Sequence, residues 1–255
     1  MKKGILMVSF GTTHLDTMKK NIEELEHYIG EKFPDYQIYR AFTSGMILRK
    51  IKREEGIHID TVGEALERMA SDGVHCAVIQ PTHIINGIEN ERMLEEVRKQ
   101  EVRFERVCVG KPLLSSADDY KKAVHAVMAE TKLAPGEVLA LMGHGTDHYA
   151  NASYPMLEYT FHTLGYGDVL VGTVENFPDL NNVMTKLQIC GAKKVALMPF
   201  MLVSGDHAKN DMAGEEESWK SEMERAGYEV RVILKGLGEF KGIRRIFEEH
   251  IREAL

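Results

Sequence analysis

Short apolar runs alternate with amphipathic segments along the whole chain, and this alternation is the strongest constraint on its fold. Strands are expected at 4–10, 36–42, 76–81, 104–110, 138–143, 168–174, 195–201 and 228–234. Helical periodicity falls near 15–29, 44–55, 61–71, 89–99, 116–132, 152–164, 179–190, 211–226 and 239–254. This order predicts the α/β class, with parallel sheets that are covered by helices on both faces.

The two halves of the sequence also resemble each other in detail. FGTTH (10–14) aligns with HGTDH (144–148), and IQPTHIINGIE (79–89) aligns with LMPFMLVSGDH (197–207). The alignment pairs Phe10 with His144 and Glu89 with His207. We therefore expect an internal duplication that gives two similar lobes.

The expected lobes are residues 1–115 and residues 116–255, each a parallel sheet flanked by helices. The second lobe would carry the functional site, and its last helix is a candidate to pack back on the first lobe. A duplicated α/β domain is expected to bind its ligand between the halves, where the carboxyl ends of the strands converge.

Composition narrows the function classes. The formal net charge is -7, which argues against nucleic-acid binding because the chain has no excess of Lys and Arg to neutralise a phosphate backbone. No apolar stretch reaches transmembrane length, so no membrane partner is expected. The three cysteines stand singly, without a CxxC spacing, and indicate neither a disulfide framework nor a thiolate zinc site. These features predict a cytoplasmic protein.

Three polar side chains follow successive strands of the second half. His144 lies between two glycines after the strand at 138–143, Glu175 follows the strand at 168–174, and His207 follows the strand at 195–201. Open α/β sheets bind ligands at this edge, so two imidazoles and a carboxylate would converge on one cleft. Two nitrogen ligands and one oxygen ligand suit a borderline divalent metal with open coordination positions.

Plainer interpretations exist for each residue. His144 could be a turn histidine bonded to the backbone, His207 a solvated loop residue, and Glu175 an exposed strand-end carboxylate. Nucleotide and acyl-transfer chemistry are poorly supported, because the chain has neither a GxxxxGK[ST] phosphate loop nor a GxSxG elbow. A phosphate-handling enzyme with a histidine nucleophile would need an arginine cluster beside the glycine turn, and none lies near it in sequence.

Five motifs in order resemble the anaerobic cobalt chelatases of the CbiK type over essentially the full length. They are LMVSFGTTH, PTHIINGIENERM, LMGHGTDH, GTVENFPD and MPFMLVSGDHAKNDMAG. The resemblance implies a two-lobed class II chelatase fold, related to the protoporphyrin ferrochelatases. It also implies a lyase that inserts Co²⁺ into sirohydrochlorin during cobalamin synthesis, without ATP and with no cofactor beyond the substrate metal.

The resemblance also assigns roles to residues. His144 matches the family's metal-binding and proton-accepting histidine, and Glu175 and His207 match its other metal ligands. Glu89 matches a cleft carboxylate, which we expect to act in catalysis by relaying protons. Because Phe10 and Glu89 stand where symmetric relatives carry histidines, one metal site is expected.

Apolar side chains near the cleft would bury the macrocycle, and we expect Phe10, Ile85 and Met201 to bind it. Several points stay open at the level of sequence. These are the physiological metal, with Ni²⁺ and Fe²⁺ as alternatives, a homo-oligomeric state, the residues that bind the substrate carboxylates, and metal contacts from His148, His83 or Glu89. A non-catalytic metal or tetrapyrrole carrier is the competing function, since two-lobed α/β proteins often simply bind ligands.

Overall fold

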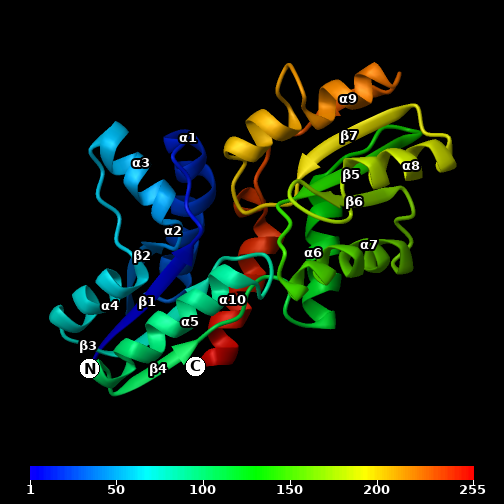
Figure 1. Cartoon of the computed structure of the whole chain (residues 1–255). Coiled ribbons are helices and arrows are strands. Elements are labelled where there is room, and N and C mark those ends of the chain that lie inside the picture. The colour runs from blue at the N-terminus through cyan, green and yellow to red at the C-terminus, as the bar shows by residue number, and fades with distance from the viewer. The chain divides into compact units, whose positions relative to one another are not determined.

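A computed structural model describes all residues, 1–255, and the chain divides into two compact units. Unit 1 comprises Met1–Ser115 together with Ile243–Leu255, and unit 2 comprises Ser116–Gly242. Each unit has its own four-stranded parallel sheet, so the expected α/β architecture with two similar sheets is confirmed (Figure 1). No helix is long and apolar enough to cross a membrane.

Unit 1 is built on a sheet of order β2-β1-β3-β4. Its strands are β1 (Lys2–Ser9), β2 (Tyr36–Phe42), β3 (Val74–Pro81) and β4 (Arg106–Val109). Its helices are α1 (Leu15–Thr17), the π-helical turn η1 (Met18–Glu23), α2 (Glu24–Lys32), α3 (Gly45–Glu55), α4 (Val62–Ser71), α5 (Ile88–Gln100), the 3₁₀ turn η2 (Glu101–Arg103) and most of α10 (Lys241–Ala254).

The core of unit 1 follows from the alternation of side chains along its strands. Leu6 and Val8 of β1 face a cluster that includes Leu66 of α4 and Met93 of α5. Helix α4 begins at a capping box in which the side chains of Thr61 and Glu64 satisfy each other's backbone N–H groups. The apolar runs thus become strands because helices cover them.

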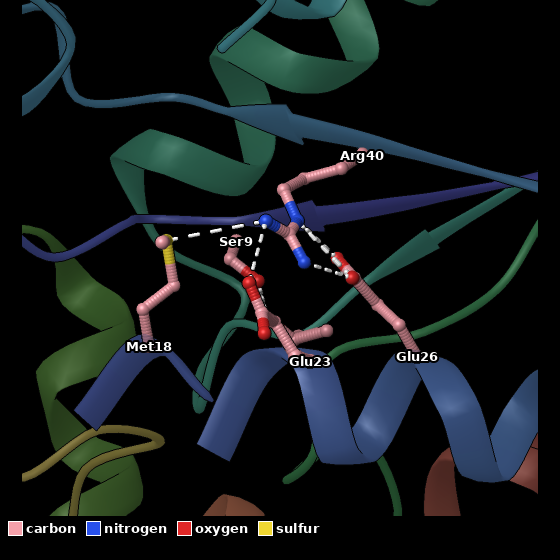
Figure 2. Close-up of polar contacts among 6 residues, drawn as sticks. Ser9, Met18, Glu23, Glu26 and Arg40 are labelled. Carbon is pink, nitrogen blue, oxygen red and sulfur yellow. Dashed lines mark hydrogen bonds and ion pairs between the residues drawn. The ribbon is translucent and has the colours of Figure 1, made fainter. Parts of the chain in front are cut away.

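A charge cluster fixes η1 and α2 against β2. Arg40 of β2 donates from Nε to Glu26 Oε1 at 2.9 Å, and it also pairs with Glu23, as Figure 2 shows. The Glu26 side chain is 11% exposed, and burial raises its pKa although Arg40 opposes that effect. Arg40 therefore compensates a carboxylate that is largely removed from water.

Unit 2 repeats this plan with the order β6-β5-β7-β8. Its strands are β5 (Glu137–Gly143), β6 (Val169–Thr173), β7 (Lys194–Pro199) and β8 (Glu229–Val232). Its helices are α6 (Ala117–Glu130), α7 (Ser153–Thr163), α8 (Leu180–Cys190) and α9 (Trp219–Arg225), with the short turns η3 (Tyr149–Ala152), η4 (Ala208–Met212) and η5 (Leu237–Glu239). Side chains of α8, η4 and α9 pack on one face of this sheet.

Backbone pairing places the two halves in one common register. The N–H of Thr82 bonds to the carbonyl of Val8 in unit 1, and the N–H of Phe200 bonds to the carbonyl of Met142 in unit 2. Phe10 follows Val8 by two residues, as His144 follows Met142. Glu89 follows Thr82 by seven residues, as His207 follows Phe200. The register therefore agrees with the sequence alignment of the halves.

One predicted helix differs from expectation. The helix predicted over 211–226 is only α9, because Ser218 caps a new helix and Glu217 adopts a left-handed φ of 50° just before it. The last helix of the expected second lobe, 116–255, was a candidate to pack back on the first lobe, and residues from Ile243 onward group with unit 1. There, Arg244 pairs with Glu24 of α2 and places α10 against that helix.

Candidate metal centre

Three potential metal ligands lie together at the carboxyl edge of the sheet in unit 2. His144 directly follows β5, Glu175 follows β6, and His207 precedes η4 after β7. One donor atom from each residue lies within 4.8 Å of the others. Neighbouring strand ends explain this proximity, since the N–H of Glu175 bonds to the carbonyl of His144.

The two glycines around His144 have separate structural reasons. A Cβ on Gly143 would lie 2.2 Å from Cε1 of Tyr154, so only glycine lets that ring pack against β5. Gly145 has a φ of +86°, and a Cβ there would lie 2.9 Å from Cβ of Thr173. The histidine is thus held in a tight turn with its ring partly open, and its side chain is 37% exposed.

Tyr154 packs against this turn and stabilises it by hydrogen bonds. The residue is 2% exposed, and the backbone groups of His144 and Gly145 hydrogen-bond to its hydroxyl. Burial raises the pKa of Tyr154 to about 12, so the hydroxyl remains protonated. Sequence reasoning did not single out Tyr154, because an aromatic residue nine positions after the turn gives no recognisable signal.

The neighbours of His144 indicate which ring nitrogen carries the proton. Its Nδ1 lies 2.8 Å from the carbonyl oxygen of Gly145, and a carbonyl only accepts, so Nδ1 carries the proton in the neutral ring. The Oε2 of Glu175 lies 3.6 Å from the same nitrogen. Nε2 is therefore left as the donor atom for a ligand.

His207 completes the group. Its ring stands edge-to-face with that of His144, with centroids 4.6 Å apart and an interplanar angle of 86°. Its Nδ1 lies 2.7 Å from Oδ2 of Asp211. Two imidazoles and one carboxylate that are all partly exposed match the donor set expected for a borderline divalent ion with open positions.

The equivalent edge of unit 1 lacks this donor set. The N–H of Ser44 bonds to the carbonyl of Phe10, just as the N–H of Glu175 bonds to that of His144. Phe10, Ser44 and Glu89 therefore occupy the positions of His144, Glu175 and His207. The phenyl ring of Phe10 cannot bind a metal and the hydroxyl of Ser44 is a weak ligand, so Glu89 provides the one carboxylate. One carboxylate is too few for a comparable metal site.

Glu89 and His83 nevertheless leave polar atoms unsatisfied in unit 1. Glu89 Oε1 accepts from Arg92 at 2.8 Å, whereas its Oε2 is buried without a hydrogen-bond partner. Nδ1 of His83 is also buried and unpartnered, and Nε2 lies 3.4 Å from the hydroxyl of Thr43. Burial lowers the pKa of His83 to about 4, although the Glu89 carboxylate opposes the shift.

The remaining predicted residues are divided between the units. Phe10 is 39% exposed and Ile85 is partly buried in unit 1, while the partly buried Met201 lies in unit 2. His148 accepts from the N–H of Ala150 through Nδ1 and caps η3, which gives it a local structural role.

A second group of possible ligands in unit 1 consists of His58, Asp60 and Glu64. Arg68 lies 2.8 Å from Asp60, and Glu64 caps α4, so both carboxylates already have partners. The group is therefore explained without an ion.

Comparison with known proteins identifies the family of this chain. Residues 3–255 match the family described as "Cobalt chelatase (CbiK)". The chain belongs to the cobalt chelatase (CbiK) family. This membership agrees with the resemblance of the motifs described above.

Two curated relatives cover the entire chain. A "Sirohydrochlorin cobaltochelatase" of Salmonella typhimurium is 42% identical over 257 residues, which span 100% of this chain and 97% of the relative. A "Sirohydrochlorin cobaltochelatase CbiKC" of Nitratidesulfovibrio vulgaris is 32% identical and is covered over 91% of its length.

Solved structures agree on the fold. SirB from Bacillus subtilis with Fe³⁺ superposes with a TM-score of 0.70 at 16% identity, covering 100% of this chain and 96% of that one. A sirohydrochlorin chelatase SirB from Bacillus subtilis subspecies spizizenii in complex with cobalt gives a TM-score of 0.68 at 16% identity, with 100% and 95% coverage. The two-sheet architecture is therefore that of chelatases.

Proposed function

We propose that this chelatase-family protein inserts Co²⁺ into sirohydrochlorin, in the synthesis of cobalamin. The observation that carries the proposal is the convergence of His144, Glu175 and His207 within 4.8 Å in a chain of the cobalt chelatase family. The names of both full-length relatives support the same substrate and metal.

Each of the three residues has a distinct part in binding the incoming metal. His144 and His207 offer neutral imidazole nitrogens, and Glu175 offsets part of the cation's charge. All three side chains are between one third and just over one half exposed, so the ion can exchange its water for protein ligands and leave again. A substrate metal must be released to the ring, which favours a three-ligand site over a closed structural one.

Metal insertion also requires proton transfer. The free macrocycle gives up two pyrrole N–H protons as Co²⁺ binds its nitrogens, so the overall charge balances. His144 is the proposed base, because the lone pair of an imidazole nitrogen can accept a proton. Its Nε2 cannot hold the metal and a proton together, so metal transfer must precede protonation at that atom.

Unit 1 is proposed to act on the ring and not on the ion. Glu89 keeps one buried oxygen without a partner, which is the state expected of an acceptor awaiting a ligand N–H. His83 is a poor base at neutral pH because of its lowered pKa, which leaves Glu89 as the proton acceptor on this edge. The apolar side chains of Phe10, Ile85 and Met201 are proposed to contact the macrocycle.

The decisive experiment mixes purified protein with sirohydrochlorin and Co²⁺, without ATP, and follows absorbance of the metallated ring over many equivalents. We expect multiple turnovers above the rate without protein. A carrier would metallate at most one ring per chain, and that result would refute the enzyme. Parallel assays with Ni²⁺ and Fe²⁺ would rank the metals, since donor atoms of this kind accept all three.

Two variants test the assigned roles. His207→Ala should weaken Co²⁺ binding strongly, because two ligands rarely hold a divalent ion well. Glu89→Ala should instead lower turnover more than metal affinity. Calorimetric titration of both variants, combined with insertion rates, separates the effects; an equal loss of affinity would mean that Glu89 is itself a ligand.

A further inference from the structure

Nδ1 of His207 lies 2.7 Å from a side-chain carboxylate, whereas Nδ1 of His144 lies 2.8 Å from a backbone carbonyl. Asp211 lies four residues later, at the fourth position of the π-helical turn η4, and its Oδ2 is 2.7 Å from Nδ1 of His207. Backbone bonds from Lys209 to Gly205 and from Gly214 to Asn210 hold the turn at both ends.

Hydrogen-bond chemistry settles where the proton of His207 resides. An ionised carboxylate only accepts, so the ring must donate from Nδ1. In a neutral ring this leaves the lone pair on Nε2, which is the nitrogen that can bind a metal. His144 reaches the same tautomer by a different route, through the carbonyl of Gly145.

We propose that Asp211 is a positioning residue of the metal centre, which holds the proton of His207 on Nδ1 and thereby presents Nε2 to the ion. This inference rests on the proposed function. Carboxylates behind metal-binding histidines commonly fix both the tautomer and the ring orientation, and they increase the basicity of the ligand.

The alternative is an ordinary stabilising pair on a helical turn. The side chains of His207 and Asp211 are 35% and 47% exposed, and pairs this exposed contribute little to folding stability. The two explanations differ in what they predict for the histidine ring. A stabilising pair would change stability, whereas a positioning residue changes the tautomer and the metal affinity.

The chain provides a matched control. His27 and Glu31 form another histidine–carboxylate pair at the same spacing, with Nε2 and Oε1 3.3 Å apart, on the exposed surface of α2 in unit 1. Glu31→Ala removes the same charge as Asp211→Ala without touching the metal centre.

The test compares the wild type, Asp211→Ala, Asp211→Asn and Glu31→Ala in two measurements. Long-range ¹H–¹⁵N spectra of the metal-free protein report the His207 tautomer, and titration with Co²⁺ alone reports affinity. We expect Asp211→Ala to mix the tautomers and weaken Co²⁺ binding by about 10- to 100-fold. Asp211→Asn should restore most of the Nδ1–H tautomer and most of the Co²⁺ affinity, because its amide oxygen can still accept a hydrogen bond. Glu31→Ala should match the wild type in both measurements.

The inference is overturned if Asp211→Ala keeps the Nδ1–H tautomer, or if it binds Co²⁺ as tightly as Glu31→Ala does. Equal losses in Asp211→Ala and Asp211→Asn would overturn it too, because charge alone would then explain the effect. If the wild type itself binds no Co²⁺, the proposed function fails, whereas the spectra still test whether Asp211 sets the tautomer. Should Asp211→Ala fail to fold, the metal-free wild type carries the tautomer test: an Nε2–H tautomer of His207 there would overturn the inference, because an ionised carboxylate at Nδ1 can only accept.

Discussion

Acidification should destabilise unit 1 through His83. The residue follows β3, with its Nδ1 buried and unpartnered, and burial lowers its pKa to about 4. In the unfolded chain the pKa of histidine is about 6.5. Between these two values the unfolded state binds more protons, so stability is complete at neutral pH and falls as the pH drops through this window.

The two pKa values give the size of the effect. At pH 5 this one group lowers the free energy of unfolding by about 2 kcal/mol. By pH 4 the reduction approaches about 3 kcal/mol. That is a substantial part of the 5–15 kcal/mol by which domains are commonly stable. His83→Gln removes the titration while keeping a polar side chain near Thr43.

Amide hydrogen exchange in β1 and β3 measures the opening of unit 1 directly and avoids mixing it with unit 2. Between pH 7 and pH 5 the wild type should lose about 2 kcal/mol more protection than His83→Gln. His27→Gln, at a site that is 73% exposed, serves as the control and should follow the wild type. Identical pH dependence in His83→Gln and the wild type would refute the reasoning.

Three further predictions follow from single contacts. Gly143→Ala should destabilise unit 2 by about 1–3 kcal/mol, visible as a lower melting temperature, because its Cβ would meet Tyr154 at 2.2 Å. His144→Ala should abolish metal insertion and leave the circular dichroism spectrum and melting temperature unchanged; an unfolded variant would make His144 structural. Arg40→Met should cost about 3 kcal/mol by leaving Glu26 buried and unpaired. Because that carboxyl then has a raised pKa, the stability difference between the variant and the wild type in denaturant titrations should shrink as the pH falls from 7 to 5, and a constant or growing difference would contradict the assignment.

The strands were the most predictable part of the fold. All eight apolar runs contain strands, because each one is short and continuous; the inner strands are buried, whereas β4 and β8 at the sheet edges are only partly buried. The sequence also indicated the three candidate ligands, since residues that follow neighbouring parallel strands must share one edge.

Other features depend on contacts that no pattern in a single sequence reveals. The helix over 211–226 was predicted from composition, but the local conformation at Glu217 and the cap at Ser218 interrupt it. Tyr154 and Asp211 act through hydrogen bonds whose partners are identifiable only in the folded chain. Ser44 was recognisable as the counterpart of Glu175 only from the backbone pairing of the strands.

The duplicated edges also predict the metal stoichiometry. Unit 2 provides a complete donor set, whereas Phe10, Ser44 and Glu89 of unit 1 provide a single carboxylate, so equilibrium dialysis should find one Co²⁺ per chain. If these positions are truly equivalent, the triple variant Phe10→His/Ser44→Glu/Glu89→His should bind a second ion. Because the Ser44 side chain caps α3, the variant should also lose about 1 kcal/mol of stability. Two ions per wild-type chain would contradict the single site, and a folded triple variant that still binds one ion would contradict the equivalence. In that case the common backbone register of the halves would not extend to the directions of their side chains.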